Sequence, residues 1–299
     1  MKEFENITLV VTCNDHFSLM LGALIQSIAT NHTSSNQIDL YVVNDHILSK
    51  NKIRINKCAD QAKINLIWLE SDVIFENVKL PLDNSSFPRN VYMRLFIPSF
   101  LPEMVKKAIY LDVDMICCTD IAKLWEIDLA GKPIAAVKDR SEVVSSEWGG
   151  ISNYKELNID PDTPYFNTGL IVFNTDVWRI EGITQKIIDA VENNIKYAGF
   201  PDQYGLNVVL AANCLSLDFR WNCYSMLDET DPFIIHFIGN KPIYKSYSDN
   251  ANYSKEFFKY LRSTPWKNFE PYSAYRRYWN KALNKIKNKL HIFKSTSRV

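Results

Sequence analysis

Short apolar runs alternate with helical patterns along the first part of this 299-residue chain. The apolar runs have the length of strands and occupy residues 7–14, 38–45, 64–70 and 108–114, whereas the helical patterns occupy 17–31 and 48–62. Strands that alternate with helices form mostly parallel sheets, which right-handed crossovers connect. We therefore expect an α/β, Rossmann-like fold with a mostly parallel central sheet.

The same alternation continues in the second part of the chain. Further strands are predicted at 133–139, 165–174 and 233–239, with helices near 183–197 and 202–212. Residues 140–164 have little periodicity and contain two glycines and two prolines, which predicts a long loop over the site. We expect one domain over residues 1–250, followed by a helical region over 251–299.

Ligands of such folds bind outside the carboxyl ends of the strands. The polar residues that end the predicted strands are Asn14, Asp15, Asn44, Asp45, Asp112, Asp114, Asp139 and Asn174. We therefore look for the site among these side chains, with the segments 140–164 and 213–232 expected to line a pocket for a second substrate.

Asp112 and Asp114 stand in the apolar stretch YLDVDMICC, residues 110–118. An ionised carboxylate is costly to bury without a counter-charge, a metal or a full set of hydrogen bonds. Side-chain alternation predicts that both carboxylates lie on the same side of an extended backbone, where they could share one hard divalent cation. The alternative is a solvated turn or a helix cap, where Asp-x-Asp triplets are common, but the flanking apolar run argues against it.

His236, in IIHFIGNKPI, also lies at the end of an apolar run. Mn²⁺ accepts an imidazole more readily than Mg²⁺ does, so this histidine is a candidate third ligand. A single histidine in an apolar strand is more often a hydrogen-bonded core residue, and His236 alone decides nothing.

Composition and motifs argue against several classes of protein. The six cysteines are scattered without a CxxC pair, which predicts reduced core residues. The N-terminal MKEFENITLVV has too short an apolar run for a signal peptide, and no apolar span reaches the length of a membrane helix, so we expect a cytoplasmic protein. The turn TCNDHFS after the first strand lacks GxGxxG, which argues against a dinucleotide-dependent dehydrogenase.

Charge is unevenly distributed, although the formal net charge is zero. From Pro271 to Val299 the chain has eight basic residues and no acid, which leaves 26 basic and 34 acidic residues in the remainder. Large apolar residues recur between these cations, a pattern typical of a helix on the inner face of an anionic membrane. The alternative is a helix that packs its apolar stripe on the rest of the protein. Because basic charge is confined to this tail and no recognition motif accompanies it, no nucleic-acid partner is expected.

Four blocks resemble, in order, the signatures of a known family. YLDVDMICCTDIAKLWEIDL is similar to the metal-binding signature of family 8 glycosyltransferases, which include bacterial lipopolysaccharide galactosyl- and glucosyltransferases and the glycogenins. Three later segments resemble the family's other signatures: YFNTGLIVFNTDVW (165–178), PDQYGLN (201–207) and HFIGNKPI (236–243). The last has one residue fewer between Gly239 and Lys241 than the family signature. The resemblance spans residues 7–244 and implies a nucleotide-diphospho-sugar transferase domain of the GT-A type.

The resemblance also implies an activity and its substrates. It implies a retaining hexosyltransferase that uses UDP-galactose or UDP-glucose and adds the hexose to a lipopolysaccharide, glycolipid or glycoprotein glycan. Asp112, Asp114 and His236 would hold Mn²⁺, with Mg²⁺ as the alternative, against the donor diphosphate. The remaining donor contacts implied are Thr12, Asn14, His16, Arg94, Val113, Asp139, Asn167, Asp202, Gln203, Gly239 and Lys241. Asn14 stands where the family usually has an aspartate.

Gln203 matches the residue that the family places beneath the anomeric carbon. A glutamine is a poor nucleophile, so we favour front-face attack by the acceptor hydroxyl, with Asp202 as the fallback nucleophile. The alternative for Asn167, Asp202 and Gln203 is turn and helix-cap chemistry, since Pro-Asp before an apolar helix is a typical helix start. A second function to weigh is a sugar-nucleotide or carbohydrate binding protein without turnover, but the intact metal triad favours the enzyme.

Overall fold

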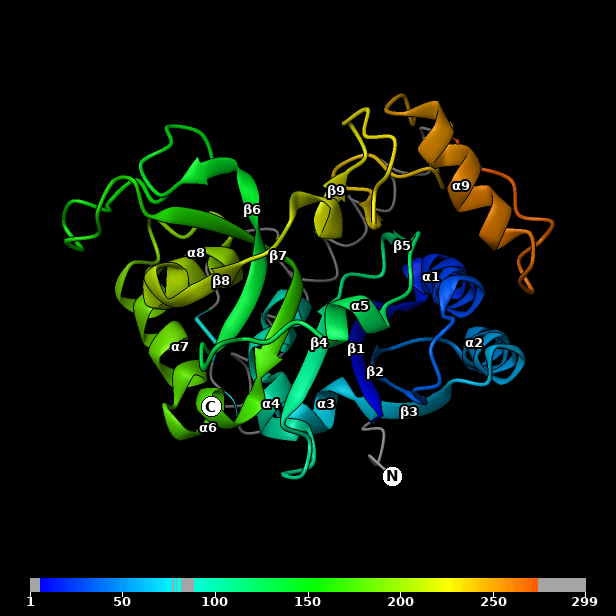
Figure 1. Cartoon of the computed structure of the whole chain (residues 1–299), viewed down its shortest axis with the longest axis horizontal. Coiled ribbons are helices and arrows are strands. Elements are labelled where there is room, and N and C mark those ends of the chain that lie inside the picture. Colours follow the sequence, from blue (N-terminus) through cyan, green and yellow to red (C-terminus); the bar gives the residue numbers. More distant parts are fainter. Residues whose placement is uncertain (1–5, 77, 79, 82–88, 274–299) are drawn as a thin grey trace, which may run out of the picture.

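The computed structural model describes residues 6–76, 78, 80–81 and 89–273. Within these residues the central sheet has the strand order β3-β2-β1-β4-β7-β6-β8 (Figure 1). Its strands are β1 (Ile7–Asn14), β2 (Ile38–Asp45), β3 (Asn65–Glu70), β4 (Lys107–Leu111), β6 (Ile134–Val143), β7 (Pro164–Asn174) and β8 (Cys214–Ser216). β1, β2, β3 and β4 run parallel, as do β6 and β8, whereas β7 is antiparallel to both β4 and β6. The prediction of a mostly parallel sheet is confirmed.

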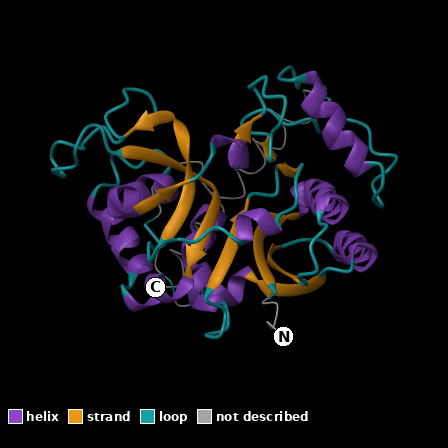
Figure 2. Cartoon of the chain, viewed as in Figure 1, coloured by secondary structure: helices purple, strands orange, loops and turns teal. Residues whose placement is uncertain are grey.

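Helices cover both faces of this sheet, as Figure 2 shows. One face carries α1 (Ser18–Asn31), α2 (Ser49–Ala62) and α9 (Ala251–Leu261), and the other carries η2 (Arg89–Phe96), α4 (Ile97–Phe100), α6 (Thr175–Ile180), α7 (Ile183–Asn193) and α8 (Pro201–Leu210). Along β1, Leu9 and Val11 belong to the core under α1, whereas Val10 belongs to the core on the opposite face. This alternation explains why successive residues of the run Leu9–Val11 are all apolar, since both faces of β1 are buried there.

A second, smaller sheet lies beside the central one. It contains β5 (Met115–Cys117), β10 (Ile234–His236) and β9 (Cys223–Tyr224), with β10 in the middle, antiparallel to β5 and parallel to β9. The predicted strand over 108–114 is therefore wrong at its end, because β4 stops at Leu111 and the chain crosses to the second sheet. Asp112 and Asp114 lie on the turn between the two sheets and not along one extended strand.

Short helices complete the connections, and several predicted boundaries shift. The short elements are η1 (Asp15–Phe17), α3 (Ser71–Ile74), α5 (Ala122–Trp125), η3 (Ala211–Asn213) and η4 (Phe219–Asn222). The strand predicted at 133–139 continues to Val143, which removes the first residues of the predicted loop 140–164. The strand predicted at 233–239 is shorter, and the helix predicted at 183–197 ends at Asn193.

The direction of β7 corrects one predicted site residue. Asn174 ends β7, but its partner across the ladder is Lys107 at the start of β4, so it lies at the edge opposite the carboxyl end of β4. Its side chain accepts a hydrogen bond from the backbone of Val177 and caps α6. At the carboxyl edge of β4, β7 contributes its beginning, which contains Asn167.

Residues beyond 250 pack on the same body as the sheet. Tyr253, Phe257 and Tyr260 of α9 are buried in the core that contains α1, and the Tyr260 hydroxyl accepts a hydrogen bond from Asn31 Nδ2 at 2.9 Å. The basic tail predicted as a membrane-surface helix lies outside the described residues from 274 onward. Among the helices that the structure does describe, none is both long enough and apolar enough to cross a membrane.

All six cysteines are free thiols, as expected. Cys118 is partly exposed and the other five are buried. Burial raises the pKa of Cys58 and of Cys117 to about 12, so these thiols remain protonated at neutral pH and act as small apolar core residues.

Candidate active site

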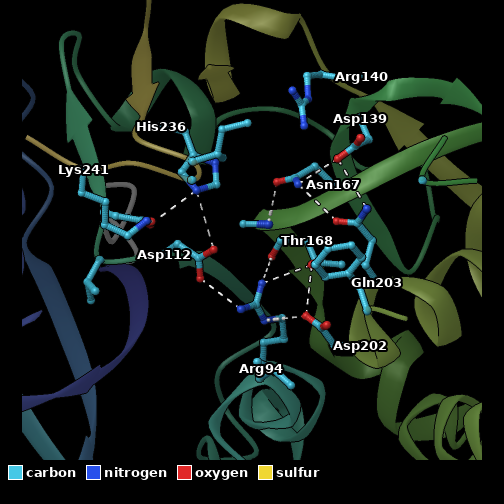
Figure 3. Close-up of a pocket in the computed structure, with 18 of the residues that line it drawn as sticks. Arg94, Asp112, Asp139, Arg140, Asn167, Thr168, Asp202, Gln203, His236 and Lys241 are labelled. Atoms are coloured by element: carbon cyan, nitrogen blue, oxygen red, sulfur yellow. Dashed lines mark hydrogen bonds and ion pairs between the residues drawn. The ribbon is translucent and has the colours of Figure 1, made fainter. Parts of the chain in front are cut away.

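A cleft of about 880 Å³ opens at the carboxyl ends of β1 and β4, where the two sheets meet (Figure 3). The predicted donor residues that line it are Thr12, Asn14, Arg94, Asp112, Val113, Asp114, Asp139, Asn167, Asp202, Gln203, His236, Gly239 and Lys241. Among these predicted donor residues His16 does not line the cleft: its Nε2 lies 2.6 Å from the hydroxyl of Tyr244 and its ring stacks on Tyr272. The strand-end residues Asp15, Asn44 and Asp45 also lie outside its lining.

Asp112 has its counter-charge in Arg94. The Nη2 of Arg94, which reaches from η2, donates to Asp112 Oδ1 at 3.1 Å, and the hydroxyl of Tyr110 donates to the same oxygen at 2.5 Å. Burial raises the pKa of Asp112, and the charge of Arg94 opposes that rise. Oδ1 of Asp112 therefore accepts two hydrogen bonds from the protein.

Asp114 has a different counter-charge, Lys241. The Nζ of Lys241 contacts Asp114 Oδ2, and it also donates to the backbone carbonyl of Phe237 at 2.9 Å. Although burial alone would raise the pKa of Asp114, Lys241 and His236 hold it well below its usual range. Two cations distant in sequence thus neutralise the two aspartates of the apolar stretch.

The remaining carboxylate oxygens face His236. Register places this histidine opposite Met115, which follows Asp114 directly. Its Nε2 lies 3.4 Å from Asp114 Oδ1 and 3.8 Å from Asp112 Oδ2. The three residues each offer one ligand atom, and these atoms lie within 4.8 Å of one another. Among the described residues this is the group of acids, histidines and cysteines close enough to share an ion.

A chain of hydrogen bonds fixes His236 Nδ1 as a hydrogen-bond donor. The backbone N–H of Gly169 can only donate, and it donates to Asn167 Oδ1 at 2.9 Å. Asn222 Nδ2 donates to the same oxygen at 2.8 Å, which leaves Asn222 Oδ1 as an acceptor 2.7 Å from His236 Nδ1. His236 therefore donates from Nδ1, which leaves Nε2 as the nitrogen that faces the two carboxylates.

This arrangement fits a hard divalent cation. Two carboxylate oxygens and one imidazole nitrogen converge, and the far nitrogen of the imidazole is held by an outer partner, as is usual for metal-bound histidines. Gly169 leaves the space open, since a Cβ at this position would lie 2.5 Å from His236 Cε1 and 3.0 Å from Asp112 Oδ2.

The other end of the cleft carries neutral and acidic hydrogen-bonding groups. Asn167 Nδ2 donates to Asp139 Oδ2 at 3.1 Å and lies 3.2 Å from Gln203 Oε1, and the hydroxyl of Tyr224 donates to Asp139 Oδ2 at 3.1 Å. In Figure 3 this cluster lies across the cleft from Lys241 and Asp112. Such a cluster is suited to binding the hydroxyls of a sugar.

Asp202 is buried and does not cap α8. The helix begins at Pro201, and its N-cap residue, Phe200, makes no side-chain cap bond. The carboxylate of Asp202 accepts a hydrogen bond from Thr168 Oγ1 at 3.1 Å and lies 3.2 Å from Arg94 Nε. That nitrogen is within ion-pair distance, but its N–H is not aligned for a hydrogen bond. Arg94 therefore links Asp202 to Asp112 beneath the cleft.

Some residues of the site were not predicted from the sequence. Tyr110, Thr168, Asn222 and Tyr224 each bond directly to a predicted site residue. Tyr110 and Thr168 lie inside two of the family-like blocks, directly beside or near the predicted residues Asp112 and Asn167. Asn222 and Tyr224 belong to the segment 213–232, which carries no pattern that marks them.

Known proteins resemble this chain over most of its length. The sequence model described as Glycosyl transferase family 8 matches residues 8–243. The chain belongs to glycosyltransferase family 8. It is 28% identical to General stress protein A of Bacillus subtilis (strain 168), over 89% of this chain and 96% of that protein. It is 27% identical to the Lipopolysaccharide 1,2-glucosyltransferase of Escherichia coli (strain K12), over 85% of this chain and 77% of that protein.

The fold is shared with a solved glycosyltransferase. The galactosyltransferase LgtC, solved with donor and acceptor sugar analogues, aligns with a TM-score of 0.73 at 19% identity, over 88% of this chain and 100% of that one. The family 8 chain described here thus has the GT-A fold, whose members use a nucleotide-sugar donor and a divalent metal.

Proposed function

We propose that this family 8 glycosyltransferase is a retaining, Mn²⁺-dependent enzyme that transfers glucose or galactose from the UDP-sugar to a glycan. The observation that carries the proposal is the convergence of Asp112, Asp114 and His236 Nε2 beside Lys241, at one end of a cleft whose other end carries Asp139 and its amide partners. A diphosphate needs cations, and a hexose needs directional hydrogen bonds, so the two ends match the two halves of the donor.

The phosphate end would bind the diphosphate through several groups. When bound, the metal ion would supply positive charge against the diphosphate as it leaves. Lys241 adds a second cation beside Asp114, and Gly239, with φ of +67°, lets the backbone turn toward the same region. Thr12 and Asn14 line the cleft at the end of β1, where the nucleoside of the donor would extend.

The residues near the sugar favour front-face attack. Gln203 presents a neutral amide, which is a poor nucleophile, and it is held by Asn167. Asp202 is a carboxylate, but it is 6% exposed and engaged by Thr168 and Arg94. We infer that the acceptor hydroxyl attacks the anomeric carbon from the side that UDP leaves, and that a phosphate oxygen of the departing UDP takes the proton. Asp202 remains the alternative nucleophile.

The acceptor would be a glycan of the cell envelope, assembled at the inner face of the cytoplasmic membrane. The support is the name of the Escherichia coli relative, which acts on lipopolysaccharide, together with the basic and apolar tail after Pro271. Such a tail favours reversible binding to anionic lipid.

Turnover of a panel of UDP-sugars tests this function. With Mn²⁺, we expect slow release of UDP from UDP-glucose or UDP-galactose and faster release when a glycan acceptor is added. A protein that binds a UDP-sugar in calorimetry but never releases UDP, with or without acceptors, would be the non-catalytic binding protein instead.

A further inference from the structure

The cleft has an apolar rim, formed by Trp148, Phe200 and Met226. These side chains line the cleft and are also large apolar groups with high exposure, at 61%, 55% and 44% respectively. They come from three separate segments: the turns after β6, the residue before α8 and the loop after β9. Apolar side chains that gather from separate segments at the mouth of a polar cleft are typical of a binding surface, unlike single exposed residues.

Trp148 is held in a fixed position within the rim. The Cζ of Arg140 lies 4.4 Å from the centroid of the Trp148 ring, and Arg140 Nη1 lies 3.3 Å from the sulfur of Met226. Ser141 Oγ donates to the Trp148 carbonyl at 2.8 Å, and the next residue, Gly149, adopts φ of +77°, which favours glycine. Arg140 packs against the indole of Trp148, yet the residue is still 61% exposed. The part of the ring that Arg140 does not cover is therefore available to a ligand.

The rim adjoins the sugar end of the cleft. Arg140 follows Asp139 directly in β6, and its Cζ lies 5.9 Å from the ring of Tyr224, whose hydroxyl bonds to Asp139. Figure 3 places Arg140 beside Asp139 and across the cleft from Lys241. A donor with its diphosphate near Lys241 and its hexose near Asp139 would leave the rim to the other substrate.

We propose that this rim is the acceptor subsite and that it binds a neutral pyranose residue through the C–H face of the sugar ring. The proposal rests on the function proposed above. One face of a pyranose is largely C–H, and a tryptophan offers it a large, rigid apolar surface at low entropic cost. The cation of the rim, Arg140, already packs on Trp148, and an acid, Asp249, also lines the cleft, so a neutral glycan fits better than a phosphorylated one.

Saturation-transfer NMR on the full chain with UDP and Mn²⁺ tests the subsite. The probes are methyl β-glucopyranoside, methyl β-galactopyranoside and lactose, with glucose 6-phosphate as the anionic comparison. We expect the ring C–H protons of at least one neutral probe to receive saturation from the protein. Trp148→Ala should raise the Kd of that probe about tenfold or more. Trp148→Phe should keep most of the affinity, because it keeps an aromatic face.

Two controls separate the subsite from nonspecific binding to exposed aromatic rings and from loss of the fold. Phe219→Ala removes another exposed aromatic ring, 51% exposed, that does not line the cleft, and it should leave probe binding unchanged. The free energy of unfolding of Trp148→Ala in urea should stay within about 0.5 kcal/mol of the wild type, since substitutions of exposed residues have small effects on stability.

Three results would overturn the subsite: wild-type probe affinity in Trp148→Ala, no binding of any neutral probe to the wild type, or tighter binding of glucose 6-phosphate than of the neutral probes. If the neutral probes bind in a manner that depends on Trp148 while no UDP-sugar is hydrolysed, the subsite stands and the proposed transferase function fails.

Discussion

Asn222→Leu should weaken metal binding without touching a ligand of the metal. Asn222 is 3% exposed, and its Oδ1 accepts the hydrogen bond from His236 Nδ1 that leaves Nε2 facing Asp112 and Asp114. Leucine has a similar size and shape but no acceptor. In the variant nothing would favour the proton at Nδ1, and the imidazole would be free to carry it at Nε2, where it blocks the metal.

The size of the effect follows from this one bond. A hydrogen bond to a buried neutral group contributes about 1–1.5 kcal/mol, which corresponds to about a tenfold change in affinity. Loss of an outer partner of a metal-bound histidine typically costs about 10–100-fold in metal affinity, because orientation and basicity are lost together. We therefore expect the Kd for Mn²⁺ to rise about 10–100-fold in Asn222→Leu.

Electron paramagnetic resonance of free Mn²⁺ measures this Kd directly, without any assay of activity. Asn222→Asp is the matched control, because it keeps an acceptor for His236 but loses the amide that donates to Asn167. That variant should bind Mn²⁺ nearly as tightly as the wild type, while its KM for the UDP-sugar rises. A folded Asn222→Leu protein that binds Mn²⁺ within about twofold of the wild type would refute the assignment of the His236 proton.

Four further outcomes are expected. Gly169→Ala should weaken Mn²⁺ binding, measured by the same resonance titration, because its Cβ would lie 2.5 Å from His236 Cε1. Gln203→Ala should slow transfer only modestly, and NMR should find the anomeric configuration retained, whereas a glycosyl adduct on the protein in mass spectrometry would exclude front-face attack. Asp120→Asn should lower the free energy of unfolding at neutral pH by about 1–3 kcal/mol in urea titrations, because its carboxylate accepts several backbone N–H bonds. Burial alone would raise the pKa of Asp120, but these bonds lower it well below its usual range, so the difference from the wild type should vanish as pH falls through that lowered pKa. A chain ending at Ser273 should lose salt-sensitive binding to anionic liposomes yet still hydrolyse the UDP-sugar; unchanged binding would place the membrane contact elsewhere.

Local periodicity was sufficient to predict much of the fold. The strands at 7–14 and 38–45 coincide with β1 and β2, and the helix predicted at 48–62 differs from α2 by one residue. These elements bury whole faces or stripes, so their spacing of apolar residues carries a strong signal. The family resemblance likewise predicted donor residues that the fold brings to one cleft, with His16 as the exception.

Features that depend on tertiary pairing could not be predicted. The apolar run from Tyr110 to Cys118 continues through two strands, so its pattern does not show that the chain changes sheets at Asp112. The direction of β7 is set by its pairing with β4 and not by its composition. For this reason Asn174 was predicted at the wrong edge of the sheet.

The neutralising groups of the two aspartates illustrate the same limit. Arg94 lies 18 residues before Asp112, and Lys241 lies 127 residues after Asp114, so nothing in the local sequence pairs them. Because Lys241 pairs with Asp114, we expect Asp114→Asn to destabilise the metal-free protein by about 1–3 kcal/mol in urea titrations, and a gain in stability would contradict this pairing.

The release of UDP from UDP-glucose and UDP-galactose, compared between the wild type and Asp114→Asn with Mn²⁺ and with EDTA, tests the central claim most directly. We predict turnover of one of these donors by the wild type with Mn²⁺, and its loss both in EDTA and in Asp114→Asn, with a folded variant confirmed by circular dichroism. Near-normal turnover by Asp114→Asn, or by the wild type in EDTA, would contradict a metal-dependent transferase built on Asp112, Asp114 and His236.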